Sequence, residues 1–218
     1  MTRDFDLSLY LVTDPLLCAE RGLVETVLAA VRGGVTMVQL RDKQADASEL
    51  VAAGRALHQS LRGSKVPLVV NDRPELAAAI GAEGVHLGQT DGDVAQARAL
   101  LGPAAIIGRS VNDIAQLVEV DPSVVDYLGV GPVFATGTKP DHKRPLGFDG
   151  LAQICAASPL PVVAIAGLRA EHAVGVRAAG ARGLAVVSAI CAAADPAAAA
   201  GEIATAWAAA ENDQETRP

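Results

Sequence analysis

The stretch Leu68-Val69-Val70-Asn71-Asp72 joins a run of three apolar residues to two polar residues that follow it directly. A strand that is apolar on both faces is covered on both sides, as the strands of a parallel sheet are. The run Val162-Val163-Ala164-Ile165 repeats the pattern and leads into Ala166-Gly167. The sequence therefore predicts buried parallel strands whose carboxyl ends carry polar residues or glycine.

Strand-like segments of this kind alternate with alanine- and leucine-rich stretches of helical spacing along the chain. The expected strands are 7–13, 36–41, 67–71, 84–88, 105–111, 126–133, 161–167 and 183–190. The expected helices lie near 22–32, 47–62, 73–80, 93–101, 113–120, 148–157, 170–179 and 195–210. Eight successive strand–helix units predict an α/β protein with a single (β/α)8 barrel, because they use the whole chain and nearly every strand has a polar end. A doubly wound open sheet is the alternative, although that fold gathers its polar strand ends at one switch point.

The length and composition of the chain narrow the class of protein. We expect one barrel domain over residues 1–218, with loose ends at about 1–6 and 211–218. The net charge of −7 argues against general nucleic-acid binding, for which a basic face is expected. The sequence has neither an apolar run long enough to span a bilayer nor a signal-peptide pattern at its start, so we expect a cytoplasmic protein without membrane contact. Cys18, Cys155 and Cys191 are expected to be buried thiols of a reducing compartment.

Asp72 and Asp91 follow neighbouring strands of the predicted barrel. Two converging carboxylates repel each other unless a cation lies between them, and Mg²⁺ is often held by one or two carboxylates together with substrate phosphates. The alternative is that Asp72 caps the helix beginning at Arg73-Pro74, and that Asp91 or Asp93 caps the next helix. Nearby arginine and lysine residues favour the metal interpretation.

Gln39, Arg41 and Lys43 form a line of hydrogen-bond donors at the end of the second strand, because alternate residues of a strand share one side. Arginine binds phosphate oxygens through a planar fork, and lysine binds them as a point charge. The alternative is a solvated strand edge with ion pairs to Asp42 or Asp46. The apolar residues around Gln39 indicate a core strand and favour the first interpretation.

Two further segments could hold an anionic group. The loop 131–140 offers two hydroxyls, a flexible glycine and a lysine in Thr136-Gly137-Thr138-Lys139, although a mobile surface loop could have the same composition. Gly167 and Val187-Ser188 end the last two strands, where backbone N–H groups of barrel loops often bind phosphate. A glycine that merely ends a strand is the alternative for Gly167.

The histidines point to no catalytic group. His86 alternates with Val85 and Leu87 in a strand, which favours a hydrogen-bonded barrel-lining role over metal binding. The other three histidines have no paired spacing, and the sequence offers Ser110 no obvious base. No Walker loop or GxGxxG after the first strand is present.

Seven motifs, read in order, resemble the thiamine phosphate synthase family over about residues 7–190. They are Leu9-Tyr10-Leu11-Val12-Thr13-Asp14, Val38-Gln39-Leu40-Arg41-Asp42-Lys43, Val70-Asn71-Asp72-Arg73, Gly84-Val85-His86-Leu87-Gly88-Gln89-Thr90-Asp91, Gly108-Arg109-Ser110, Gly129-Val130-Gly131-Pro132-Val133-Phe134 with Thr136, Thr138 and Lys139, and Val187-Ser188. The resemblance implies a (β/α)8 barrel that joins a hydroxymethylpyrimidine diphosphate to a thiazole phosphate, releases diphosphate and uses Mg²⁺.

The same resemblance implies a role for each matching residue. The pyrimidine diphosphate would be bound by Gln39, Leu40, Arg41, Asp42, Lys43, Asn71, Ser110 and Lys139, of which Arg41, Lys43, Ser110 and Lys139 are the expected catalytic residues. The thiazole phosphate would be bound by Thr136, Gly137, Thr138, Gly167, Val187 and Ser188, and Mg²⁺ by Asp72 and Asp91. No protein nucleophile or strong base is needed if diphosphate leaves first, so catalysis would be electrostatic stabilisation and positioning.

The chain departs from the family pattern at two places, and related functions compete with the synthase. Ala166-Gly167 stands where Gly-Gly is expected, and Gly137 stands where the family often has a stiffer residue. A thiazole tautomerase of the same barrel family would need an acid or base near the reacting ring, for which His86 is the strand candidate. A non-catalytic sensor of the thiamine pathway, or a phosphosugar epimerase or isomerase on the same barrel, completes the alternatives.

Overall fold

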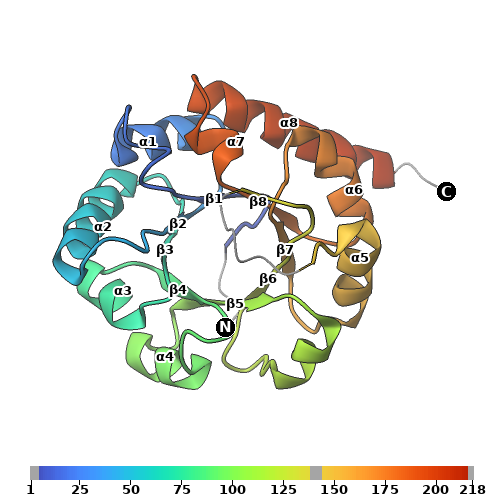
Figure 1. Cartoon of the computed structure of the whole chain (residues 1–218), viewed down its shortest axis with the longest axis horizontal. Coiled ribbons are helices and arrows are strands. Elements are labelled where there is room, and N and C mark those ends of the chain that lie inside the picture. Colours follow the sequence, from blue (N-terminus) through green and yellow to red (C-terminus); the bar gives the residue numbers. More distant parts are fainter. Residues whose placement is uncertain (1–4, 138–143, 216–218) are drawn as a thin grey trace.

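The computed structural model of the chain describes residues 5–137 and 144–215. Eight parallel strands form a closed barrel in sequence order, and helices surround it (Figure 1). The strands are β1 (Leu9–Val12), β2 (Met37–Leu40), β3 (Leu68–Asn71), β4 (Gly84–Leu87), β5 (Ile106–Val111), β6 (Tyr127–Val130), β7 (Val162–Ile165) and β8 (Gly183–Val186). Because β1 also pairs with β8, with Leu9 opposite Leu184, the barrel prediction is confirmed and the open sheet is excluded.

The helices follow the strands with a few departures from the expected pattern. They are α1 (Leu23–Arg32), α2 (Ala47–Leu61), α3 (Pro74–Ile80), α4 (Val94–Leu101), η1 (Ile114–Glu119), α5 (Gly147–Ala157), η2 (Ala170–His172), α6 (Ala173–Ala178), α7 (Ser188–Cys191) and α8 (Pro196–Glu215). Asp46 caps α2 with a capping box, and Asp195 accepts hydrogen bonds from the first turn of α8. Both helices therefore begin with an aspartate that accepts hydrogen bonds from N–H groups of the first turn.

Two expected elements differ most from the structure, one in type and one in extent. The segment expected as a helix at 113–120 is the short 3-10 helix η1, which buries none of its residues. Only partly buried residues such as Leu117 pack against the core, so η1 has little of the packing that makes most protein helices stable. The strand expected over 183–190 ends at Val186, and a helical turn begins at Ser188. Continuous apolar character hid this boundary, since short apolar runs suit buried strands and buried helices alike.

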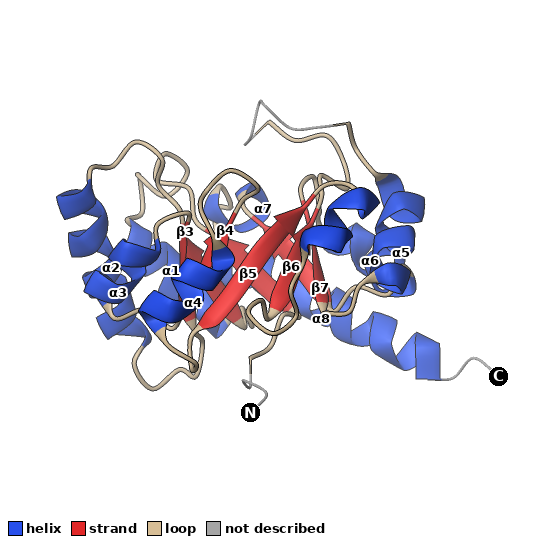
Figure 2. Cartoon of the chain, turned by 90° about the horizontal axis from the view of Figure 1, so that it is seen from below, coloured by secondary structure: helices blue, strands red, loops and turns tan. Residues whose placement is uncertain are grey.

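Two apolar clusters hold the barrel together. The larger cluster lies between the strands and the helices, where it includes Leu40, Leu128 and Val130. The smaller cluster fills the barrel interior with Tyr10, Met37, Val69, Ile106, Tyr127, Val163 and other residues. None of the helices in the described part of the chain is long and apolar enough to cross a membrane. Figure 2 shows the strand arrowheads directed to one end of the barrel.

Candidate active site

The predicted site residues gather at the carboxyl ends of the strands, beyond the apolar interior. Alternate strand residues point the same way, so Met37 in the interior leads to Gln39, and Val69 leads to Asn71. Gln39 is 4% exposed, which confirms that β2 is a core strand and excludes the solvated-edge interpretation there. The barrel thus positions both polar side chains at its inner rim.

Arg41 and Lys43 extend the line of donors from Gln39 into the loop after β2. The backbone N–H of Arg41 donates to Thr13 Oγ1 at 3.0 Å, which ties this loop to β1. Leu40 is 2% exposed and packs in the outer core, so its side chain points away from the inner rim. The Asp42 side chain accepts hydrogen bonds from the N–H groups of Gln44 and Ala45 and so shapes the loop.

The carboxyl groups of Asp72 and Asp91 lie close enough to interact, although they come from the loops after β3 and β4. Burial raises the pKa of Asp72 above its ordinary value, and the neighbouring Asp91 carboxyl raises it further. Lys43 opposes this shift, with its Nζ 3.6 Å from Asp72 Oδ2. A cation bound between these two half-buried carboxylates would reduce the repulsion between them.

Helix capping does not account for these two carboxylates. α3 has Arg73 as its N-cap residue, with no side-chain capping hydrogen bond. Asp93 caps α4 by accepting from the N–H groups of Ala95 and Gln96. Asp91 instead accepts from the Gly88 N–H at 2.9 Å. The capping alternative is therefore wrong for Asp72 and Asp91 and right for Asp93.

Arg109 is a structural residue of the site whose role the sequence analysis missed. Its guanidinium donates to the carbonyl oxygens of Gly88 at 2.8 Å, Gly92 at 3.3 Å and Gln89 at 3.3 Å. These bonds hold the β4–α4 loop that carries Asp91. Gln89 adds a second tie, since its side-chain amide donates to the Ser110 carbonyl. An arginine directly before Ser110 was the available signal.

Ser110 has a basic neighbour, contrary to the expectation from the sequence. His86 Nε2 lies 2.9 Å from Ser110 Oγ, and His86 Nδ1 lies 2.9 Å from the Tyr127 hydroxyl. His86 is 8% exposed, so the predicted barrel-lining role of this histidine is confirmed. The pairing was missed because it depends on the register of β4 against β5, in which His86 lies opposite Gly108.

The residues expected at the second substrate lie on the loops after β6, β7 and β8. Gly167 packs so closely on the β6 loop that a Cβ there would lie 2.7 Å from Phe134 Cβ and 2.8 Å from the Ala135 oxygen. In this loop Thr136 is half-buried and Gly137 is exposed, while Thr138 and Lys139 lie outside the described residues. Val187 and Ser188 form the start of α7, where the first N–H groups of a helix are available to an anion.

Ala166 adopts a backbone conformation that favours glycine, with φ of 82°. A residue with a Cβ loses roughly 1–2 kcal/mol of stability in the left-handed region. Glycine removes this strain, but it also raises the conformational entropy of the unfolded protein, which offsets part of the gain in stability. We expect Ala166→Gly to raise the free energy of unfolding by up to about 1 kcal/mol, measured by urea denaturation. Gly167→Ala is the opposite control and should destabilise, since its φ is 69° and its Cβ position is occupied. An Ala166→Gly protein that is less stable than the wild-type protein would contradict the claim that Ala166 is strained.

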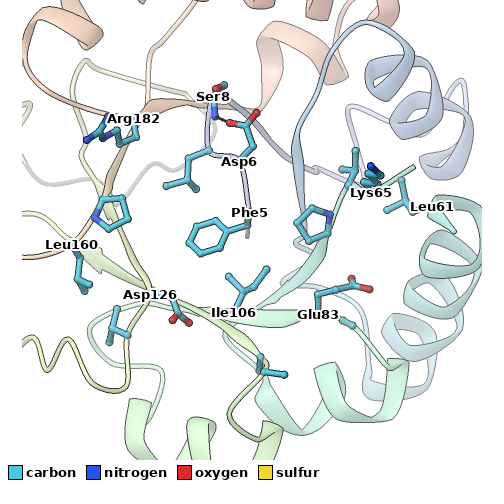
Figure 3. Close-up of a pocket in the computed structure, with 18 of the residues that line it drawn as sticks. Phe5, Asp6, Ser8, Leu61, Lys65, Glu83, Ile106, Asp126, Leu160 and Arg182 are labelled. Carbon is cyan, nitrogen blue, oxygen red and sulfur yellow. Dashed lines mark hydrogen bonds between the residues drawn. The ribbon is translucent and has the colours of Figure 1, made fainter. Parts of the chain in front are cut away.

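A large cavity lies at the opposite end of the barrel from these residues. Its lining includes Glu83, Asp126 and Arg182, each of which directly precedes a strand (Figure 3). Two of these charged side chains bind backbone groups of the barrel: Glu83 accepts a hydrogen bond from the Leu68 N–H, and Asp126 accepts one from the Ile107 N–H. In barrels of this type the amino ends of the strands contribute stability, whereas chemistry occurs at the carboxyl ends. We therefore assign the site to the carboxyl end.

Comparisons with known proteins agree with the fold and with the range of residues over which the resemblance was seen. The family model described as thiamine monophosphate synthase matches residues 9–190. Thiamine-phosphate synthase of Azorhizobium caulinodans is 56% identical over 89% of this chain and 92% of its own length, and that of a Psychrobacter species is 51% identical over 87% and 90%. A solved structure of thiamine phosphate pyrophosphorylase from Pyrococcus furiosus superposes with a TM-score of 0.84 at 35% identity, covering 94% of this chain and 96% of that one.

Proposed function

The chain belongs to the thiamine monophosphate synthase family, and from this premise we propose that it joins a hydroxymethylpyrimidine diphosphate to a thiazole phosphate. The products are thiamine phosphate and diphosphate. The observation that carries the proposal is the Asp72–Asp91 pair beside Lys43 at the carboxyl end of the barrel. We place this enzyme in the cytoplasm, with small molecules as its substrates.

Asp72 and Asp91 are the proposed ligands of Mg²⁺. Carboxylate oxygens are the donors that this hard cation prefers, and two of them leave room for substrate phosphate oxygens and water. Among residues 5–137 and 144–215, no group of three or more His, Cys, Asp or Glu residues that could hold a metal occurs. When bound, the ion would supply positive charge to the leaving diphosphate.

The chain's own cations would bind and orient the same diphosphate. Arg41 follows β2 directly, and Lys43 already lies beside Asp72. We assign both, with Gln39 and Asn71, to the pyrimidine diphosphate, and we assign Lys139 of the β6–α5 loop to it from the sequence. These groups stabilise the charge that grows on the leaving group without giving or taking a proton.

The proposed reaction exchanges one bond for another. The bond between the pyrimidine methylene carbon and the diphosphate oxygen breaks, and its electron pair leaves with the diphosphate. The thiazole nitrogen then uses its lone pair to form the new carbon–nitrogen bond. Ser110 would contact the pyrimidine ring, and Thr136, Gly137, Thr138, Gly167, Val187 and Ser188 would hold the thiazole phosphate so that its nitrogen faces the cation.

A thiazole tautomerase fits the described geometry less well. That reaction would need an acid or base exposed to the ring, yet both ring nitrogens of the mostly buried His86 face hydroxyl groups of the protein. Turnover assays separate the candidates. A synthase requires both substrates and Mg²⁺, a tautomerase converts the thiazole phosphate alone, and a sensor binds both compounds without forming product.

Substitutions at the two ends of the pocket test the assignment of the substrates. Arg41→Ala should raise the KM for the pyrimidine diphosphate, because the variant loses a phosphate-binding guanidinium. Ser188→Ala should raise the KM for the thiazole phosphate through the lost hydroxyl. An effect of roughly tenfold is expected for each, as for the loss of one hydrogen bond to a charged group. The measurement is the KM of both variants for both substrates, and a shift confined to the same substrate in both would refute the division.

A further inference from the structure

Five polar side chains form a continuous hydrogen-bonded chain across the barrel interior. Gln39 Nε2 donates to the Tyr10 hydroxyl at 2.8 Å, and the two hydroxyls of Tyr10 and Tyr127 lie 2.8 Å apart. The Tyr127 hydroxyl lies 2.9 Å from His86 Nδ1, and His86 Nε2 lies 2.9 Å from Ser110 Oγ. This series of hydrogen bonds therefore links Gln39, which is assigned to the diphosphate, with Ser110, which is assigned to the pyrimidine ring.

The barrel makes room for this chain by placing glycines in two neighbouring strands. A Cβ at Gly108 would overlap the Tyr127 ring and would lie 2.5 Å from His86 Nδ1. A Cβ at Gly129 would lie 2.8 Å from His86 Cε1. Strand-interior glycines cost stability, so two of them packed against the same ring mark a position that the fold keeps open for it.

Among these five side chains, only one direction of the hydrogen bonds gives both buried tyrosine protons an acceptor. Burial raises the pKa of Tyr10 and of Tyr127, so both hydroxyls keep their protons. Tyr10 accepts from Gln39, so its own proton is free for Tyr127. The Tyr127 proton is then free for His86 Nδ1, which must be an unprotonated acceptor. A neutral imidazole with this tautomer carries its proton on Nε2, which faces Ser110.

We propose that this buried chain fixes the His86 tautomer protonated on Nε2, and that His86 thereby makes the Ser110 hydroxyl a hydrogen-bond donor toward the pyrimidine substrate. Ser110 Oγ accepts from His86, so its own proton is directed to a ring nitrogen acceptor. With the other tautomer, Ser110 would donate to His86 and could only accept from the substrate. His86 and Tyr127 are positioning residues in this arrangement, and the substrate part of the inference rests on the proposed function.

The tautomer can be observed in the free, full-length protein. Nitrogen NMR of histidine-labelled protein distinguishes a protonated ring nitrogen from an unprotonated one, and His86→Gln identifies the His86 signals. We expect a protonated Nε2 and an unprotonated Nδ1. Tyr127→Phe removes the donor to Nδ1 and should mix the two tautomers, whereas Tyr10→Phe keeps that donor and should leave the tautomer unchanged. A protonated Nδ1 in the wild-type protein, in a neutral or a charged ring, overturns the proposal.

Kinetics test the effect on the substrate. Tyr127→Phe should lower kcat/KM for the pyrimidine diphosphate about tenfold, with an unchanged KM for the thiazole phosphate. In a Ser110→Ala background the same change should have no further effect, because the hydroxyl that His86 orients is gone. Full additivity of the two substitutions indicates a merely structural tyrosine and overturns the proposal. If the wild-type protein makes no thiamine phosphate, the proposed function fails while the NMR result still decides the tautomer.

Discussion

Asp72→Asn is expected to reduce turnover by on the order of 100-fold or more while the protein stays folded. The amide keeps the shape of the side chain but loses the charge that would hold the metal beside Asp91. Asparagine also tolerates the left-handed backbone of this position, where φ is 65°, so the loop should keep its conformation. Asp91→Asn should have the same effect. The measurement is steady-state turnover at saturating Mg²⁺, with circular dichroism to verify folding.

Asp93→Asn is the matched control for this prediction, because it removes a carboxylate from the loop that carries Asp91. Asp93 caps α4 and takes no part in the acidic pair, and asparagine is an equally good cap. Its turnover should stay close to that of the wild-type protein. Full activity of Asp72→Asn and Asp91→Asn, or wild-type activity in EDTA, would discard the magnesium assignment.

A trifluoromethyl group on the pyrimidine substrate is expected to slow the reaction by orders of magnitude. If diphosphate departs before the thiazole attacks, positive charge develops on the pyrimidine, and an electron-withdrawing substituent raises the energy of that cation. The phosphate contacts proposed for Arg41 and Lys43 would not involve the substituent, so binding should change much less than kcat. Single-turnover measurements with both substrates give the rate of the chemical step directly.

The size of this effect distinguishes two reaction paths. A direct displacement spreads less positive charge onto the ring and would be only mildly sensitive to the substituent. A trifluoromethyl substrate that reacts at nearly the normal rate, in an assay where chemistry limits the rate, would exclude the cation. The proposed mechanism would then no longer explain why the reaction needs no activating base.

The fold could be predicted because its signals are local. Each strand is a short apolar run with a polar end, and one such run, Leu68–Asn71, already carries the pattern. The order of the runs then requires parallel strands with helical crossovers, which a closed barrel satisfies. The end of β8 could not be predicted from the sequence, because Val186 and Ile190 are equally apolar although one is in a strand and the other in a helix.

The candidate site could be predicted only where its residues act through their own strand ends. Gln39 and Asp72 follow this rule, whereas the contact of Ser110 with His86 depends on the pairing of two strands. The Tyr10–Tyr127 hydrogen bond joins residues 117 positions apart across the barrel, and no local pattern encodes it. The mid-strand residues Gly108 and Gly129 were the available sign that large rings occupy this part of the interior.

The most direct test of the central claim is the release of diphosphate and the formation of thiamine phosphate, measured together with each substrate alone and with both. The proposed function predicts one diphosphate for each thiamine phosphate, with both substrates and Mg²⁺ required. The reaction should be lost in Asp72→Asn and kept in Asp93→Asn. Diphosphate release that proceeds at the same rate without the thiazole phosphate, or no thiamine phosphate from both substrates, would contradict the assignment.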